Sequence, residues 1–172
     1  MDQAYIPAVC GVPVLNAGMS GAVVADLIPL APDVIKQSEP PRMLISVGIN
    51  NALPKAKHVT VSDYSQQLDQ IVSAALAAGI DVSVLTQTAA RSDQPLGLDI
   101  PKLKEIDGAI RRLAQRHQVR LIDVAATLAG TGGEMPKTST IDGVHLTAEG
   151  YAIWTSKIQQ EACRPTAPPA SR

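Results

Sequence analysis

The chain has 172 residues, 45% of them hydrophobic, and a formal net charge of −1 from 15 basic and 16 acidic side chains. This apolar fraction is enough for the core of one folded domain, so it excludes a mainly disordered chain. Basic residues form no stripe or tail and aromatic residues are scarce, so we expect no nucleic-acid partner. Prolines and polar residues interrupt the apolar region at 8–31, so we expect no membrane span.

The two cysteines, Cys10 and Cys163, stand near opposite ends of the chain. The sequence has no CxxC motif and no Cys/His pattern with metal-ligand spacing, so we predict no metal site. We expect two buried thiols, with a disulfide that joins the terminal helices as the alternative.

Short apolar runs alternate with helical patterns along the chain. Residues 1–11 resemble the end of a helix. The apolar runs are rich in Val, Ile and Leu and do not strictly alternate, which is typical of strands covered on both faces of a parallel sheet. We expect strands at residues 12–16, 43–48, 81–88 and 119–124, and helices at residues 21–30, 60–79, 100–117 and 147–163.

Capping residues support three of these helices. Thr60 and Asp63 have the spacing of a capping box, and Gly79 is typical of a helix end. Asp99 and Thr147 stand where N-caps are expected for the two later helices.

The alternation of strands and helices predicts a doubly wound α/β domain over residues 1–163, followed by a Pro-rich tail at 164–172. Ligands of such folds bind at the carboxyl ends of the strands. Residues 16–18 and 48–51 each follow a predicted strand, and Asp142 and His145 precede the last helix, so all can lie at one edge of the sheet.

Three sequence motifs occur in an order that carries a family resemblance: "NAGMSG" around Gly18, "GINN" at 48–51, and "DGVH" at 142–145 before "LTAEGY". Together they resemble the SGNH (GDSL-type) hydrolases. The resemblance implies a flavodoxin-like three-layer αβα sandwich that hydrolyses esters or thioesters with a serine. Asn51 differs from the family pattern, which has Asp at this position.

The predicted chemistry can be described residue by residue. His145 would act as general base and acid, and Asp142 would hold its tautomer and stabilise the imidazolium. The backbone N–H of Gly18 and the side-chain amide of Asn50 would donate to the oxyanion of the tetrahedral intermediate. This mechanism needs no cofactor and no metal.

The nucleophile is absent from this arrangement, because no Gly-Asp-Ser motif occurs in the chain. The resemblance places that serine, and the first strand that carries it, upstream of Met1. The missing strand would lie between the strands at 12–16 and 43–48, which would then be about 9.6 Å apart.

Other serines and histidines do not supply the missing group. Ser20 lies in the motif that contributes oxyanion donors, and Ser46 lies in a predicted buried strand. Three further serines lie on a predicted helix: Ser62, Ser65 and Ser73. His58 and His117 have no acid at a useful spacing, so we expect both to be surface residues.

We therefore predict a serine hydrolase for acyl esters of small or carbohydrate-like alcohols. A catalytically inactive member of the fold that binds an ester or carbohydrate is the alternative. A two-metal phosphoesterase is disfavoured because too few acidic and histidine ligands converge. A nucleotide-binding protein is disfavoured because no phosphate-binding motif occurs.

Overall fold

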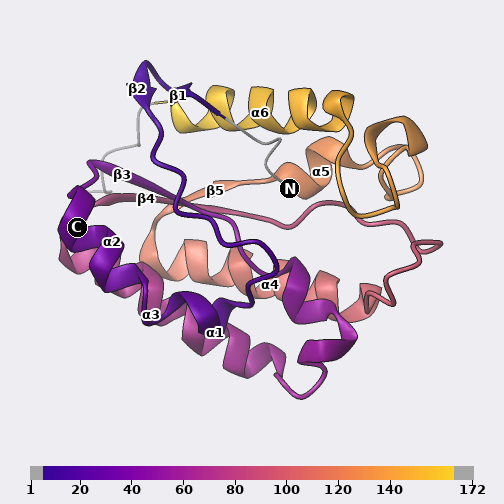
Figure 1. Ribbon diagram of the computed structural model, residues 1–172, viewed down its shortest axis with the longest axis horizontal. Coiled ribbons are helices and arrows are strands. Elements are labelled where there is room, and N and C mark those ends of the chain that lie inside the picture. Colours follow the sequence, from indigo (N-terminus) through magenta and orange to yellow (C-terminus); the bar gives the residue numbers. More distant parts are fainter. Residues whose placement is uncertain (1–5, 165–172) are drawn as a thin grey trace.

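The centre of the molecule is a three-stranded parallel sheet in the order β3-β4-β5 (Figure 1). The computed structural model describes residues 6–164. The strands are β3 (Arg42–Ile45), β4 (Asp81–Leu85) and β5 (Arg120–Ile122). Strands β4 and β5 lie within apolar runs that predict strands, and β3 begins one residue before the run predicted at 43–48. Because the strands are parallel, their carboxyl ends share one edge of the sheet.

Helices cover both faces of this sheet and complete three layers (Figure 1). One face carries α1 (Val24–Leu27), α2 (Ala31–Ser38), α3 (Val61–Ala77) and α4 (Ile100–His117). The other face carries α5 (Val124–Leu128) and α6 (Ala148–Ala162). Three single 3₁₀ turns complete the structure: η1 (Ile49–Ala52), η2 (Pro54–Ala56) and η3 (Lys137–Ser139). The predicted three-layer α/β architecture is confirmed.

The three longest helices begin where their capping residues indicate. The Thr60 hydroxyl accepts the N–H of Asp63 at 3.0 Å, and the Asp63 carboxylate accepts the N–H of Thr60 at 2.9 Å. Asp99 and Thr147 each accept a backbone N–H three residues further on, at the starts of α4 and α6. Each such cap typically contributes about 1 kcal/mol, because it satisfies a backbone donor that the helix itself cannot.

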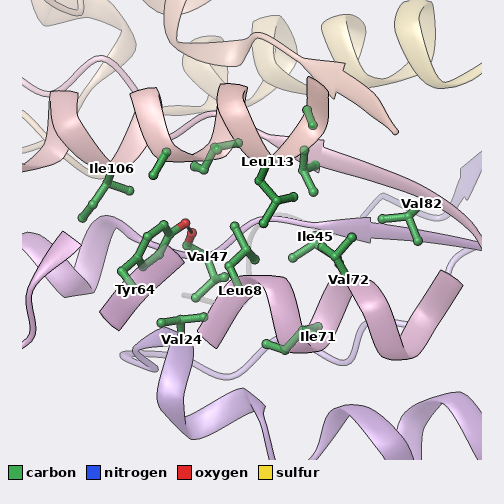
Figure 2. Close-up of a cluster of buried hydrophobic side chains, with 14 of the residues drawn as sticks. Val24, Ile45, Val47, Tyr64, Leu68, Ile71, Val72, Val82, Ile106 and Leu113 are labelled. Carbon is green, nitrogen blue, oxygen red and sulfur yellow. Dashed lines mark hydrogen bonds between the residues drawn. The ribbon is translucent and has the colours of Figure 1, made fainter. Parts of the chain in front are cut away.

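The larger part of the core lies between the sheet and α1–α4 (Figure 2). Its side chains come from the helix faces that pack against the sheet and from alternate residues of β3 and β4. The residues labelled in Figure 2 are Val24, Ile45, Val47, Tyr64, Leu68, Ile71, Val72, Val82, Ile106 and Leu113. Full burial of one such aliphatic side chain stabilises the fold by about 1.5–3 kcal/mol, so this layer holds α3 and α4 in place.

The segment at 12–16 does not join the parallel sheet, so this strand prediction is wrong. Only Val12–Pro13 (β2) forms a ladder, and it pairs antiparallel with Ala8–Val9 (β1). Cys10 and Gly11 connect the two strands with φ values of 54° and 76°. Two consecutive left-handed residues are typical of a type I′ hairpin turn, so local turn geometry decides the pairing.

The same hairpin corrects the prediction for residues 1–11. Residues 6–11 do not end a helix, because they include β1 and its turn. The first five residues lie outside the described part of the chain.

Cys10 and Cys163 form a disulfide with their Cα atoms 5.3 Å apart, and both residues are exposed. The expectation of two buried thiols is therefore wrong. The reason is tertiary, because α6 runs along the sheet until its last turn meets the hairpin. Gln159 of α6 also bonds the hairpin, where it donates to the carbonyl of Ala8 at 2.5 Å and accepts the N–H of Cys10 at 3.3 Å.

Two short helices, α2 and α5, are absent from the sequence-based expectations, and the helix expected at 21–30 is limited to α1. Pro29 and Pro32 explain part of the difference. Proline lacks a backbone N–H and is tolerated in the first turn of a helix, so Pro32 starts α2 rather than continuing α1.

Strand β3 is an edge strand, because within residues 6–164 only β4 pairs with it. The segments at 12–16 and 43–48, predicted to flank a missing strand, do not pair with each other. Ser46 follows β3 and is exposed, so its predicted burial is wrong. No neighbouring strand among the described residues covers this side of β3.

Most of the Pro-rich tail predicted at 164–172 lies outside the described residues, which end at Arg164. Within the described part, no helix combines the length and the apolar character that crossing a bilayer requires.

Candidate active site

The "DGVH" motif forms a tight turn immediately before α6. Thr140 and Leu146 form a β-bridge on either side of it, and the N–H of Ile141 donates to the carbonyl of His145 at 2.8 Å. The Thr140 hydroxyl donates to the same carbonyl and accepts the N–H of Gly143 at 2.9 Å. These bonds close the turn on itself, so the positions of its acid and its imidazole are fixed locally.

Asp142 and His145 form the predicted acid–imidazole pair, with 2.6 Å between Oδ2 and Nδ1. The other carboxylate oxygen, Oδ1, accepts the backbone N–H of Val144 at 3.0 Å and that of His145 at 2.8 Å. Both carboxylate oxygens are thus engaged, which orients the carboxylate toward the ring. The Nε2 atom of His145 makes no hydrogen bond within the described residues, and 36% of this side chain is exposed.

The hydrogen bonds of Asp142 also determine its charge. Desolvation is the largest single influence and raises its pKa, but the bonds from the His145 ring and from two backbone N–H groups together outweigh it. The net result is a pKa below the ordinary value for aspartic acid, so the carboxylate is ionised at neutral pH. An ionised partner at Nδ1 favours the tautomer whose Nε2 lone pair can accept a proton.

Gly143 suits this turn because the turn leaves no room for a side chain at its position. Its φ is +87°, and a Cβ atom would lie 2.7 Å from Cβ of Gln94 and 3.2 Å from Cβ of Arg91. The carbonyl of Gly143 accepts the N–H of Arg91 at 2.8 Å. The turn is therefore bound to the loop that follows β4.

Asn50 lies on η1, directly after the Gly48 turn that follows β3. Its Nδ2 donates one N–H to the carbonyl of Ala22 at 2.9 Å, and its second N–H makes no hydrogen bond within residues 6–164. Asn51 is fully buried, and its Oδ1 accepts the N–H of Val24 at 3.1 Å. This turn is thereby joined to the segment that leads into α1.

The Asn50 turn and the His145 turn both bind the loop after β4. The N–H of Ile49 donates to Oε1 of Gln87 at 2.8 Å, and the N–H of Arg91 donates to the carbonyl of Gly143. The two predicted motifs therefore meet the same seven-residue stretch at 86–92, at the carboxyl edge of the sheet. Neither Gln87 nor Arg91 was predicted from the sequence. The signal that could have identified them is the run of mostly polar residues that follows the buried strand β4.

Gly18 lies in the exposed segment between β2 and α1. Its N–H donates to Oδ1 of Asn16 at 2.9 Å, so this predicted oxyanion donor is engaged in a local turn. The described contacts link its segment to the Asn50 turn through the carbonyl of Ala22, and they include none between Gly18 itself and Asn50 or His145. To act as predicted, the N–H of Gly18 would have to release Oδ1 of Asn16 and donate to the oxyanion instead.

No serine hydroxyl hydrogen-bonds to the His145 ring within the described part of the chain. Ser20 and Ser46 are exposed in loops, one before α1 and one after β3. The serines at 62, 65 and 73 lie on α3, which covers the face of the sheet opposite to α6. Among the residues at 6–164, the structure therefore brings together the acid and the base without a serine bonded to the imidazole.

The remaining histidines differ from each other. His58 is exposed, as expected. His117, expected on the surface without an acid, is partly buried at the end of α4, and its Nε2 lies 2.6 Å from Oδ1 of Asp69 on α3. This pair joins α3 to the C-terminal end of α4, which leads into β5. The loop after β4, which contacts the Asp142–His145 turn, leads into the opposite end of α4. Residues 6–164 contain no cluster of three or more His, Cys, Asp or Glu residues arranged to hold a metal ion.

Comparisons with known proteins identify the family and the fold of this chain. The model of the GDSL-like lipase/acylhydrolase family matches residues 3–153. Among solved structures, a lipase/acylhydrolase from Enterococcus faecalis aligns with a TM-score of 0.75 at 23% identity, covering 87% of this chain and 75% of that one. A GDSL-like lipase from Bacteroides thetaiotaomicron aligns with a TM-score of 0.74 at 19% identity, covering 83% and 72%.

A catalytic mutant of an acetylxylan esterase from Geobacillus stearothermophilus aligns with a TM-score of 0.75 at 18% identity, covering 92% of this chain and 76% of that one. At these identities the likeness of the three structures concerns the fold. The comparison with curated protein sequences gave no match.

Proposed function

The chain belongs to the GDSL-like lipase/acylhydrolase family, and we propose that it hydrolyses carboxylic (acyl) esters by a Ser-His-Asp mechanism in which Asp142 and His145 are the acid and the base. Family membership supports ester hydrolysis in general. The observation that carries the finer assignment is the 2.6 Å contact between Nδ1 of His145 and Oδ2 of Asp142.

In this mechanism His145 accepts the proton of the serine hydroxyl at Nε2 as the serine attacks the ester carbonyl. The imidazolium then returns the proton to the leaving alcohol, and a water molecule repeats the sequence on the acyl-enzyme. Asp142 stays ionised throughout and stabilises the imidazolium. The lowered pKa of Asp142 supports this role.

The oxyanion of the tetrahedral intermediate is assigned to the second N–H of the Asn50 amide and to the backbone N–H of Gly18. Loss of one such donor typically costs about 3–4 kcal/mol of transition-state stabilisation. The Asn50 donor is supported by its fixed position on η1. The Gly18 donor becomes available when Asn16 releases it.

The nucleophile serine of this proposal is carried by a segment upstream of the given sequence, in a strand that pairs with the open edge of β3. Two observations support this placement. Among the described residues β3 is paired on one side only, and no serine hydroxyl contacts His145. A strand added beside β3 would end at the same edge of the sheet as the Asn50 turn.

For the substrate we propose acyl esters of small or carbohydrate-like alcohols. The acetylxylan esterase among the structural neighbours acts, by its name, on an ester of this class.

A second candidate is a catalytically inactive member of the family that binds an ester or carbohydrate without hydrolysing it. It is favoured by the engagement of Gly18 with Asn16 and by the absence of a serine at His145 within residues 6–164.

Hydrolysis of p-nitrophenyl acetate distinguishes the two candidates when the given chain is compared with a version extended upstream through a Gly-Asp-Ser segment. Activity of the extended version alone supports the proposed esterase, whereas inactivity of both folded proteins supports the non-catalytic member.

In an active version, His145→Ala should lower kcat by several orders of magnitude and Asp142→Asn somewhat less. His58→Ala, at an exposed histidine outside the turn, is the matched control. A normal rate for His145→Ala would refute the assignment of the base.

A further inference from the structure

Gln87 follows β4 and lies at the centre of the contacts that hold the Asn50 turn. Its side chain is buried, and both ends of its carboxamide are used. Oε1 accepts the N–H of Ile49 at 2.8 Å, and Nε2 donates to the carbonyl of Val47 at 3.0 Å. The backbone N–H of Gln87 donates to Oδ1 of Asp107 at 2.7 Å, which fixes the base of the side chain to α4.

The two groups that Gln87 binds belong to the peptide units on either side of Gly48. Gly48 has a φ of +144°, and a Cβ atom there would lie 3.0–3.1 Å from Ile106, Tyr64 and Gln87. The crowding requires glycine, but glycine also gives the backbone freedom to rotate. The carboxamide of Gln87 bonds both flanking peptide units, and the Tyr64 hydroxyl also donates to the carbonyl of Val47 at 2.8 Å, so this freedom is removed.

We propose that Gln87 is a positioning residue for ester hydrolysis, because its carboxamide clamps both peptide units around Gly48 and thereby sets the direction of the Asn50 amide. This inference rests on the proposed function, in which Asn50 donates to the oxyanion. Asn50 follows Ile49 directly, so rotation about Gly48 would carry the amide away from the position of the developing charge. Gln87 itself touches no reacting atom.

The chemistry of the clamp explains why glutamine suits this position. One end must accept from an N–H and the other must donate to a carbonyl, and a primary amide does both. An ionised glutamate only accepts, so one of its oxygens would face the carbonyl of Val47 without a proton between them. A protonated glutamate can again accept with one oxygen and donate with the other. Burial raises the pKa of a carboxyl group, which moves this exchange into an accessible pH range.

The test compares Gln87→Glu and Gln87→Met with the parent protein in the extended, active form, by measuring kcat and KM for p-nitrophenyl acetate from pH 5 to pH 9. Gln87→Met, which forms neither bond, should lower kcat about 10- to 100-fold with KM nearly unchanged, which is less than the loss of a whole oxyanion donor. For Gln87→Glu, the ratio of its kcat to that of the parent should rise as the pH falls, because protonation of the introduced carboxyl restores both bonds. Dividing by the parent rate removes the pH dependence that both proteins share.

Gln67→Met is the matched control, because Gln67 lies on α3 and its buried Oε1 has no hydrogen-bond partner among the described residues. It should leave kcat unchanged. The proposal is overturned if Gln87→Met raises KM while kcat stays normal, or if the kcat ratio for Gln87→Glu is the same at every pH.

A second measurement on the given chain separates the clamp from the proposed function. Amide hydrogen exchange followed by NMR should show faster exchange at Ile49 in Gln87→Met than in the parent, with unchanged protection in α6. If the extended protein proves inactive while Ile49 behaves as expected, the proposed function fails and the clamp stands as structure. Unchanged exchange at Ile49 would overturn the clamp itself.

Discussion

Replacement of Asp107 by asparagine should make the protein more stable at neutral pH. Asp107 lies on α4 beneath the end of β4, and burial is the main reason that its pKa is raised to about 6. Its hydrogen bond from the N–H of Gln87 and the nearby Arg111 oppose this rise, whereas the nearby Asp123 adds to it. Asparagine keeps an oxygen that can accept from Gln87 but carries no charge to desolvate.

The sign of the pH dependence follows from the raised pKa. Between the unfolded value of 3.8 and the folded value of about 6, the folded protein binds more protons than the unfolded chain at Asp107. The contribution of Asp107 to the free energy of unfolding is therefore fully favourable below pH 3.8 and is lost as the pH rises through 6. The difference between the two pKa values corresponds to at most about 3 kcal/mol, and partial exposure of Asp107 should reduce it to about 1–2 kcal/mol.

Urea unfolding of the parent and of Asp107→Asn between pH 4.5 and pH 8 measures the effect. The variant should gain about 1–2 kcal/mol relative to the parent at pH 8, and the gain should shrink as the pH falls toward 4.5. Asp69 and Asp142, whose pKa values are lowered, destabilise both proteins alike at acid pH and cancel in the difference. A difference that is constant with pH, or a variant less stable at pH 8, would refute this reasoning.

Three further predictions concern stability. Replacing Cys10 and Cys163 together by serine removes a disulfide over a sequence separation of 153 residues. The gain in chain entropy of the unfolded state should lower the free energy of unfolding by up to about 5 kcal/mol. Denaturant titration measures this loss, and an unchanged midpoint would contradict it. Gly150→Ala should destabilise α6 by about 1–3 kcal/mol in thermal unfolding, because the new Cβ would collide with the carbonyl of Ser139. Gly108→Ala in α4, where the Cβ meets only the end of a flexible side chain, should instead stabilise by about 0.5–1 kcal/mol, so equal effects of the two changes would disprove the steric argument.

The sequence by itself determined the elements whose signals are local. The capped helices α3, α4 and α6 begin where Thr60, Asp99 and Thr147 indicate, because a cap bonds a backbone N–H only three residues away. The three strands of the parallel sheet match the predicted apolar runs to within one residue at their starts. The contact of Asp142 with His145 was also predictable, because it spans three residues within one turn.

Only the tertiary structure decided the features that join distant segments. Cys10 meets Cys163 because α6 reaches the hairpin, and Gln87 meets Ile49 because β3 and β4 are neighbours in the sheet. Residues 38 or 153 positions apart leave no periodic or capping signal in either segment, since each contact exists only when the layers are packed together. The acid–imidazole pair is thus a property of one short motif, whereas the clamp around Gly48 is a property of the folded sheet.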